Sequence, residues 1–150
     1  MKGYWNRPDA TEEAIKDGWF YSGDAGFFDE EGYLYIHDRV KDMIVSGGEN
    51  IYPAEVENAL MSHPEIADAA VIGVPDDKWG ESVKGFVVLQ PDSNLDETEI
   101  ISYTRTQIAG YKCPKTINFI EALPRNPSGK ILRRESVSYT HLTLPTTSCV

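Results

Sequence analysis

The sequence has few cations for its size. It contains 14 Lys and Arg against 24 Asp and Glu, which gives a net charge of -10. A protein that binds nucleic acid through the phosphate backbone needs clustered Lys and Arg, and such clusters occur here only locally, at residues 112–115 and 130–134. The charge therefore argues against nucleic acid as the main partner.

Long apolar runs, a signal peptide and metal-ligand spacings are also missing. No run reaches the roughly 18 apolar residues of a transmembrane segment, and the first ten residues lack an apolar centre. Cys113 and Cys149 are too few for a disulfide framework or a metal set, and the three histidines share no ligand spacing. We therefore expect a cytoplasmic chain with no transmembrane segment and no metal site of its own.

What is present is typical of one folded core. The chain has 150 residues, of which 41% are hydrophobic and 25% charged. Its composition breaks near residue 136, because residues 136–150 contain no charged side chain and seven of the fifteen are Ser or Thr. The run VSYTHLTLPT within this segment resembles the in-frame translation of a transposase adaptor used in sequencing, so we expect residues 136–150 not to be native.

Before that break, short strands alternate with helices. The first block has Asp9 and Glu12 at capping-box spacing, which predicts a helix over 11–16. The strands predicted after it are 19–22, 26–29 and 33–37.

The second block predicts a complete small fold. A strand at 43–45 and a Gly47-Gly48 loop precede a helix that begins at Pro53, and Asp96 with Glu99 caps a second helix. The remaining predicted strands are 67–74, 83–89 and 116–120. The order strand, helix, strand, strand, helix, strand predicts the α+β class, with a small mixed sheet packed with helices.

Two segments resemble consecutive motifs of the adenylate-forming superfamily, which includes acyl-CoA synthetases, adenylation domains and luciferases. They are GWFYSGDAGFFDEEGYLYIHDRVKDMIVSGGENIYPAEVE and LPRNPSGKILRRE. The resemblance spans about residues 1–135, but family members are several times longer, so Met1 is expected to be internal or a mis-called start. It implies three parts: residues 1–38 as the end of the large AMP-binding domain, 39–41 as a hinge, and 42–135 as the mobile C-terminal domain.

The resemblance assigns roles on the ATP side. Asp24 would bind the ribose hydroxyls of ATP, with an Asx turn as the alternative, and Arg39 would assist there. The alternative for Arg39 is a surface ion pair with Asp38 or Asp42. Lys41 occupies the hinge position, where a solvated lysine is the plain alternative.

Lys130 is the residue that the resemblance marks as catalytic. It follows Asn126-Pro127-Ser128-Gly129, a stiff loop able to present one long cation to charge that builds up on carboxylate and α-phosphate oxygens. The alternative is an ordinary solvated lysine. Ile131 occupies the place where a phosphate-cradling P-loop has Ser or Thr, so the loop is not of that kind.

The resemblance also implies roles on the CoA side for five further residues. Gly47 and Gly48 would line the pantetheine tunnel, with an ordinary hairpin turn as the alternative. Trp79, Tyr111 and Lys112 would border the CoA nucleotide, with core anchoring as the alternative for the two aromatic residues. Some relatives carry a basic residue where this chain has Cys113, which puts a 3'-phosphate contact at that position in doubt.

The implied function is an acyl-CoA ligase that uses ATP, Mg²⁺ and CoA to activate a carboxylic acid, with fatty acids favoured. The Mg²⁺ site, phosphate loop and acyl pocket would lie in the large domain, so this chain alone is expected to be inactive. Two alternatives are an adenylation domain that loads a carrier protein and a free-standing small binding or regulatory domain.

Overall fold

The structure, a computed structural model, describes residues 1–133, so the predicted adaptor segment 136–150 lies outside the described part. The chain divides into two compact units, Met1–Lys41 and a second that begins at Asp42. No helix within the described residues is long and apolar enough to cross a membrane.

The first unit consists of a short helix and two separate hairpins. Its elements are α1 (Pro8–Ala14), β1 (Ile15–Lys16), β2 (Trp19–Phe20), β3 (Asp24–Phe28) and β4 (Leu34–Arg39). β1 pairs only with β2, and β3 only with β4, both antiparallel. None of the side chains in this unit is fully buried. The unit therefore has strands but no hydrophobic core of its own.

The helix predicted over 11–16 was wrong at both ends, because α1 ends at Ala14 and residues 15–16 form β1. The helix begins at Pro8 rather than at residue 11, and Arg7 is the N-cap without a side-chain capping bond. Proline favours the first helical turn because its φ is already helical and its missing N–H would be unsatisfied there. Asp9 therefore lies inside the first turn, where its carboxylate accepts a 2.8 Å hydrogen bond from Arg7.

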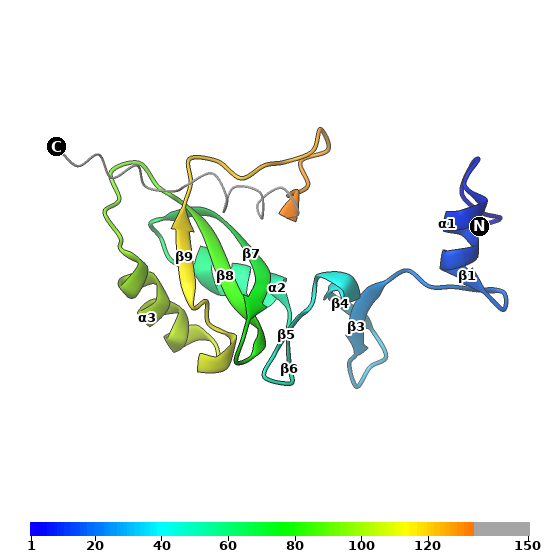
Figure 1. The fold of residues 1–150 in the computed structure, drawn as a ribbon, viewed down its shortest axis with the longest axis horizontal. Helices are drawn as coiled ribbons and strands as arrows, with labels where there is room; N and C mark the ends of the chain where they lie inside the picture. The colour runs from blue at the N-terminus through cyan, green and yellow to red at the C-terminus, as the bar shows by residue number, and fades with distance from the viewer. Residues whose placement is uncertain (134–150) are drawn as a thin grey trace. The chain divides into compact units, whose positions relative to one another are not determined.

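The second unit is a five-stranded mixed sheet with two helices (Figure 1). The strands follow the order β6-β5-β8-β7, and β9 pairs with β8 in parallel. The elements are β5 (Ile44–Ser46), β6 (Glu49–Ile51), α2 (Pro53–Met61), β7 (Ile66–Asp76), β8 (Gly80–Leu89), α3 (Glu97–Gln107) and β9 (Thr116–Phe119). This confirms the predicted α+β fold, with one strand, β6, that the sequence did not predict.

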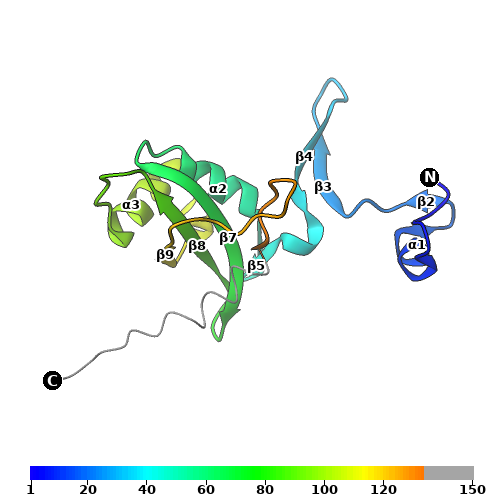
Figure 2. The ribbon, with the colours of Figure 1, turned by 90° about the horizontal axis from the view of Figure 1, so that it is seen from above.

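Both faces of this sheet are buried. Successive residues of a strand point alternately to one face and to the other. Val71 of β7 and Val87 of β8 pack with Leu60 of α2 and Ile100 of α3, while Phe86 of β8 belongs to a second cluster on the other face. Alternate residues of a strand point to opposite faces, so neighbouring residues can enter different clusters. Figure 2 shows both helices on one side of the sheet. The chain after β9 covers the other face through Leu123 and Ile131.

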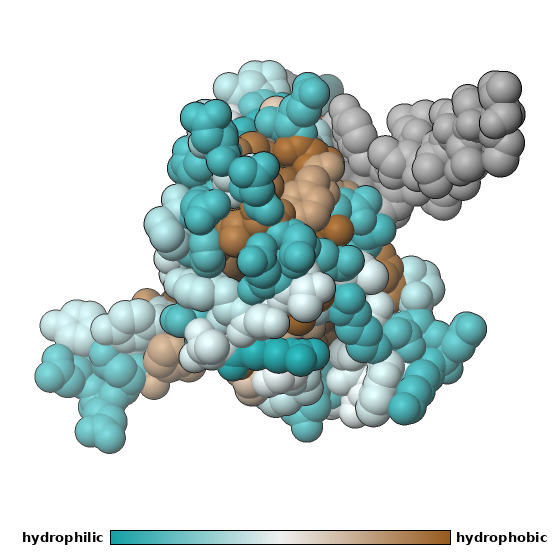
Figure 3. Space-filling model, turned by 90° about the vertical axis from the view of Figure 1, so that its left-hand side faces the viewer, coloured by the Kyte–Doolittle hydropathy of each residue, from teal (hydrophilic) through white to brown (hydrophobic). Residues whose placement is uncertain are grey.

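The outer surface is mainly hydrophilic on the face drawn in Figure 3, with one area where hydrophobic side chains gather. A hydrophilic surface around two internal apolar clusters is the arrangement expected of a small globular domain. The second unit therefore has the core that the first unit lacks.

Candidate functional site

Lys130 lies at the end of a compact loop that is held by its own hydrogen bonds. The Asn126 side-chain oxygen accepts bonds from the backbone N–H groups of Ser128 and Lys130, at 3.0 and 2.8 Å. The backbone N–H of Asn126 donates to the carbonyl of Lys130 at 2.9 Å, which closes the loop. Gly129 has a φ of +84°, a left-handed conformation that favours glycine. These hydrogen bonds give the loop one compact shape.

The Lys130 side chain itself is exposed and has no hydrogen-bond or ion-pair partner within residues 1–133. A lysine ammonium is a compact charge with three donors, and here none of them is occupied by another described side chain. The loop thus presents a cation that is available to a ligand.

Asp24 and Arg39 lie opposite each other in the first unit. They are direct partners in the β3–β4 register, and Nε of Arg39 lies 3.0 Å from Oδ1 of Asp24. Nη1 of Arg39 also donates to the carbonyl of Ser22 at 3.1 Å. The structure therefore brings the two predicted ribose-side residues together, and the ion pair of Arg39 is with Asp24. The alternative for Arg39 was an ion pair with Asp38 or Asp42. Asp42 instead pairs with Arg133.

Lys41 is exposed and lies in a short 3-10 turn, Val40–Asp42, where one compact unit ends and the next begins. Such a turn can absorb a change of backbone angles without disturbing a core. The hinge role of Lys41 stays a prediction.

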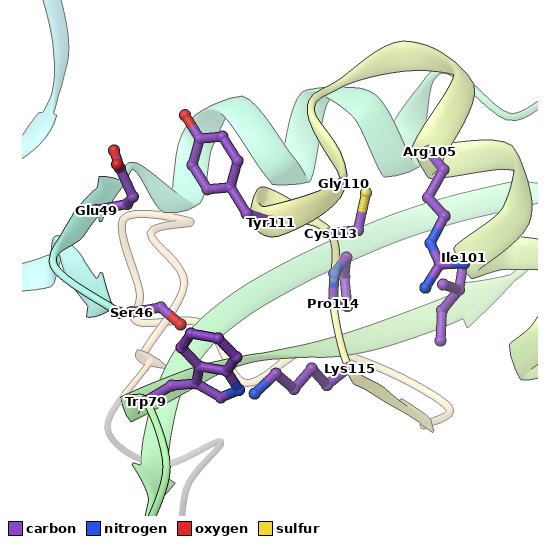
Figure 4. Close-up of a pocket in the computed structure, with 11 residues that line it drawn as sticks. Ser46, Glu49, Trp79, Ile101, Arg105, Gly110, Tyr111, Cys113, Pro114 and Lys115 are labelled. Carbon is purple, nitrogen blue, oxygen red and sulfur yellow. The ribbon is translucent and has the colours of Figure 1, made fainter.

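A pocket of about 390 Å³ lies between the β5–β6 hairpin, the turn before β8, and the segment from α3 to β9 (Figure 4). Three predicted CoA-side residues line it, namely Gly47, Trp79 and Tyr111, whereas Gly48 and Lys112 do not. The lining also includes residues that the sequence did not single out as site residues: Ser46, Glu49, Ile101, Arg105, Gly110, Pro114 and Lys115.

The Gly47-Gly48 segment is the turn of the β5–β6 hairpin, and both glycines have positive φ, +61° and +86°. Two central residues with positive φ are typical of the tight turns that suit the twist of a hairpin. The Gly47 N–H donates to the carbonyl of Trp79 at 2.9 Å, and a Cβ at Gly47 would lie 2.8 Å from the indole. The pocket therefore requires glycine where the hairpin meets Trp79.

Trp79 and Tyr111 are 43% and 53% exposed, so the core-anchoring alternative is wrong for both. The Trp79 backbone N–H donates to Asp76 at 3.0 Å, and this bond helps to hold the turn. Two ammonium groups lie near the indole ring, that of Lys78 at 4.7 Å and that of Lys115 at 5.4 Å from its centre. The ring is thus placed on an exposed wall of the pocket, and Figure 4 shows the Lys115 side chain beside it.

The pocket is lined by two cations, Arg105 and Lys115, and one acid, Glu49. Lys115 binds the carboxylate of Asp76 at 2.9 Å, and this contact, with the Trp79 N–H, lowers the pKa of Asp76 to about 2. Arg105, on α3, has no hydrogen-bond or ion-pair partner among the described residues. Lys112 binds Glu55 at 2.7 Å, which raises the pKa of the lysine. Arg105 is therefore the lining cation most available to an anion.

Cys113 contributes no charge to the pocket. It is a buried free thiol, and burial raises its pKa, although the charge of Arg105 acts in the opposite direction. Within residues 1–133, no group of three or more His, Cys, Asp and Glu side chains could hold a metal ion.

Lys130 and the pocket occupy different parts of the second unit. No residue of the 126–130 loop lines the pocket, and Figure 1 shows the loop and the β5–β6 hairpin at opposite ends of the unit. One small domain therefore carries two separate surfaces with exposed cations.

Comparisons with known proteins identify the family of the chain. A family model described as the AMP-binding enzyme C-terminal domain matches residues 55–130. A feruloyl-CoA synthase from an Amycolatopsis species is 55% identical over 90% of this chain, and the long-chain-fatty-acid–CoA ligase FadD13 of Mycobacterium tuberculosis is 52% identical over 93% of it. The chain covers 28% of the length of each relative.

A solved structure supports the same assignment. The o-succinylbenzoate CoA synthetase of Bacillus subtilis, in complex with its acyl-adenylate intermediate, matches with a TM-score of 0.85 at 45% identity. The match covers 91% of this chain and 28% of that one. The chain belongs to the family of AMP-binding enzyme C-terminal domains.

Proposed function

We propose that this chain is the C-terminal part of an ATP-dependent acid–thiol ligase that converts a carboxylic acid to an acyl-CoA through an acyl-adenylate. The observation that carries the proposal is the exposed Lys130 at the end of a hydrogen-bonded loop, with no side-chain partner among residues 1–133, within a domain of the AMP-binding family. The large domain would supply the acyl pocket, the phosphate loop and the residues for Mg²⁺.

In the first step, a carboxylate oxygen of the acid attacks the α-phosphorus of ATP, and pyrophosphate leaves. Negative charge develops on the phosphoryl oxygens, and the ammonium of Lys130 would stabilise it at close range. The carboxylate of Asp24, held by Arg39 at 3.0 Å, would accept hydrogen bonds from the two ribose hydroxyls of the nucleotide. Each group would thus position or stabilise ATP without forming a covalent bond to it.

In the second step, the sulfur of CoA attacks the acyl carbonyl carbon, and AMP leaves. The 390 Å³ pocket would hold the nucleotide of CoA, because it combines the exposed faces of Trp79 and Tyr111 with cations. Since Cys113 is neutral and buried, Arg105 and Lys115 would make the phosphate contacts in this chain. Gly47 would allow the pantetheine arm to pass close to the backbone.

Turnover of both steps would require the domain to rotate about Lys41. The 126–130 loop and the β5–β6 hairpin lie at opposite ends of the second unit in Figure 1, so one orientation would place only one of the two surfaces at the reacting atoms. The substrate is proposed to be a fatty acid on resemblance alone, and ATP–pyrophosphate exchange with a panel of fatty and aromatic acids tests this choice.

Two variants of the full-length protein test the proposal. One is expected to impair adenylation alone, and the other to impair CoA binding alone. Lys130→Ala is expected to slow adenylation by about 10²- to 10³-fold, because a charge-stabilising donor is removed, and to spare thioester formation from supplied acyl-AMP. Arg105→Ala is expected to raise the KM for CoA roughly tenfold and to leave adenylation unchanged, because one charge-assisted bond is lost.

Three outcomes would contradict the proposal. An equal loss of both half-reactions in Lys130→Ala would refute the division of labour between the two surfaces. A wild-type protein that transfers its acyl group to a carrier protein and not to CoA would identify a carrier-loading adenylation domain instead. ATP–pyrophosphate exchange by the isolated 150-residue chain would show that no large domain is needed.

A further inference from the structure

Two arginines flank the Lys130 loop in the sequence, and both tie it to the body of the second unit. Arg125 precedes the loop. Its Nη1 donates to the carbonyl of Gly129 at 2.7 Å, and its Nη2 forms an ion pair with Asp68 on β7. One guanidinium therefore joins the loop backbone, next to Lys130, to the sheet.

Arg133 follows the loop and binds two acids. Its Nη2 donates to both carboxylate oxygens of Glu57, at 2.8 and 3.0 Å, and its Nε lies 3.2 Å from one of them. Its Nη1 lies 3.2 Å from Oδ2 of Asp42. Arg133 thus connects the end of the loop to α2 and to the residue directly after Lys41.

Glu57, the partner of Arg133, is buried and only 7% exposed. Its Oε1 also accepts the backbone N–H of Val71 at 2.9 Å, so the carboxylate is fixed between α2 and β7. A buried carboxylate without a cation is strongly unfavourable, so Arg133 is constrained to remain on it. The position of the chain three residues after Lys130 is fixed as a result.

Apolar packing by itself would fix the loop less well. Leu123 and Ile131 attach the surrounding segment to the sheet, but hydrophobic contact has no direction and permits rotation and sliding. A guanidinium that binds two partners at once imposes both distance and orientation. The two arginines supply the directional part of the attachment.

We propose that Arg125 and Arg133 are positioning residues that hold the ammonium of Lys130 in the geometry needed for adenylation. Through Asp42, Arg133 also links the orientation of the loop to the segment beside the hinge. This inference rests on the proposed function, because it concerns the step that Lys130 would serve. Neither arginine lines the pocket, so we expect their replacement to spare the CoA-dependent step.

The test replaces each arginine by lysine in the full-length protein, as Arg125→Lys and Arg133→Lys. Lysine keeps a cation beside Asp68 or Glu57, so the domain should remain folded, but it cannot bind two partners in fixed directions. A displacement of about 1 Å can cost on the order of 10²-fold in rate, so we expect a loss of 10- to 100-fold in kcat for adenylation. The KM for ATP and thioester formation from supplied acyl-AMP should stay within about twofold of wild type.

Arg7→Lys is the matched control, because Arg7 pairs with Asp9 on the exposed surface of the first unit. It should leave both half-reactions unchanged. Unchanged adenylation in Arg125→Lys and Arg133→Lys would overturn the inference. So would an equal loss of both half-reactions with a lower Tm, because that pattern is a general structural defect. A wild-type protein without adenylation activity would refute the proposed function itself.

Discussion

At the residue scale, the turn that carries Trp79 depends on one carboxylate. Oδ1 of Asp76 accepts the backbone N–H groups of Lys78 and Trp79, each at 3.0 Å, and Oδ2 binds the ammonium of Lys115. Asp76 thus orients the indole and one of the pocket cations together. The charge of Asp76 therefore strengthens its bonds to the turn backbone and to the Lys115 ammonium, and protonation would weaken both.

This arrangement predicts an acid-induced change in the turn. The Lys115 ammonium and the Trp79 N–H lower the pKa of Asp76 from 3.8 to about 2. Because the folded pKa is depressed, the stabilisation is fully present above pH 3.8 and is lost as the pH falls through about 2. NMR titration of the Asp76 carboxyl carbon should give a midpoint near 2.

Lys115→Met is the control for this titration, because it removes the first cause of the shift. The midpoint should then rise toward the ordinary value of 3.8. A wild-type midpoint already near 3.8 would contradict the arrangement of the turn.

The sequence could single out Lys130, Trp79 and Tyr111 as candidate site residues because each lies within a motif or a turn that is contiguous in the chain. Arg105 and Lys115 could not be predicted in the same way, since they meet the pocket only after α3 and β9 have packed on the sheet. The pairing of Arg133 with Glu57 is similar, because it joins positions 76 residues apart. Long-range contacts of this kind leave no local pattern.

At the element scale, the same capping pattern has opposite outcomes in α1 and α3. Asp96 accepts the N–H of Glu99 at 2.8 Å, and the Glu99 side chain accepts the N–H of Asp96 at 3.0 Å, so α3 has the predicted capping box. α1 has the same spacing, but Pro8 begins the helix one residue before Asp9. In this chain the capping pair therefore marks the start of α3, where no proline precedes it, and does not mark the start of α1.

β6 was missed for a related reason. Its three residues, Glu49–Ile51, are too few to show alternation, and two of them are polar. The strand exists because the Gly47-Gly48 turn folds the chain back onto β5, where Ile44 pairs with Ile51. The turn was recognised from its glycines, but the strand that it creates depends on the pairing and not on its own residues.

The capping box of α3 gives a stability prediction. Asp96→Ala should lower the free energy of unfolding by about 0.5–2 kcal/mol, because it leaves a helix N–H group without its acceptor. Chemical denaturation followed by circular dichroism measures this difference. Asp77→Ala is the matched control, since Asp77 is exposed and has no side-chain bond among the described residues. Equal losses in the two variants would show that the cap does not stabilise the helix.

At the scale of the whole molecule, the two units differ in what holds them together. The first unit exposes large apolar side chains, including Trp19 at 74% and Phe28 at 69%, and has no buried residue. The second unit has two clusters of buried apolar side chains on either face of its sheet. Two-stranded hairpins are marginally stable without a third strand or a packed face. The strands of the first unit therefore need a covering surface, which the proposed large domain would supply.

Hydrogen exchange of the isolated chain can measure this difference. Amides in β7 and β8, which pair over ten registered positions, should exchange on the order of 100-fold or more slowly than those in β3 and β4, because local opening is cheap where little apolar surface is buried. In the full-length protein, β3 and β4 should become protected as their apolar side chains are covered. Equal protection of both hairpins in the isolated chain would mean that the first unit is stable alone. It would then need no covering domain.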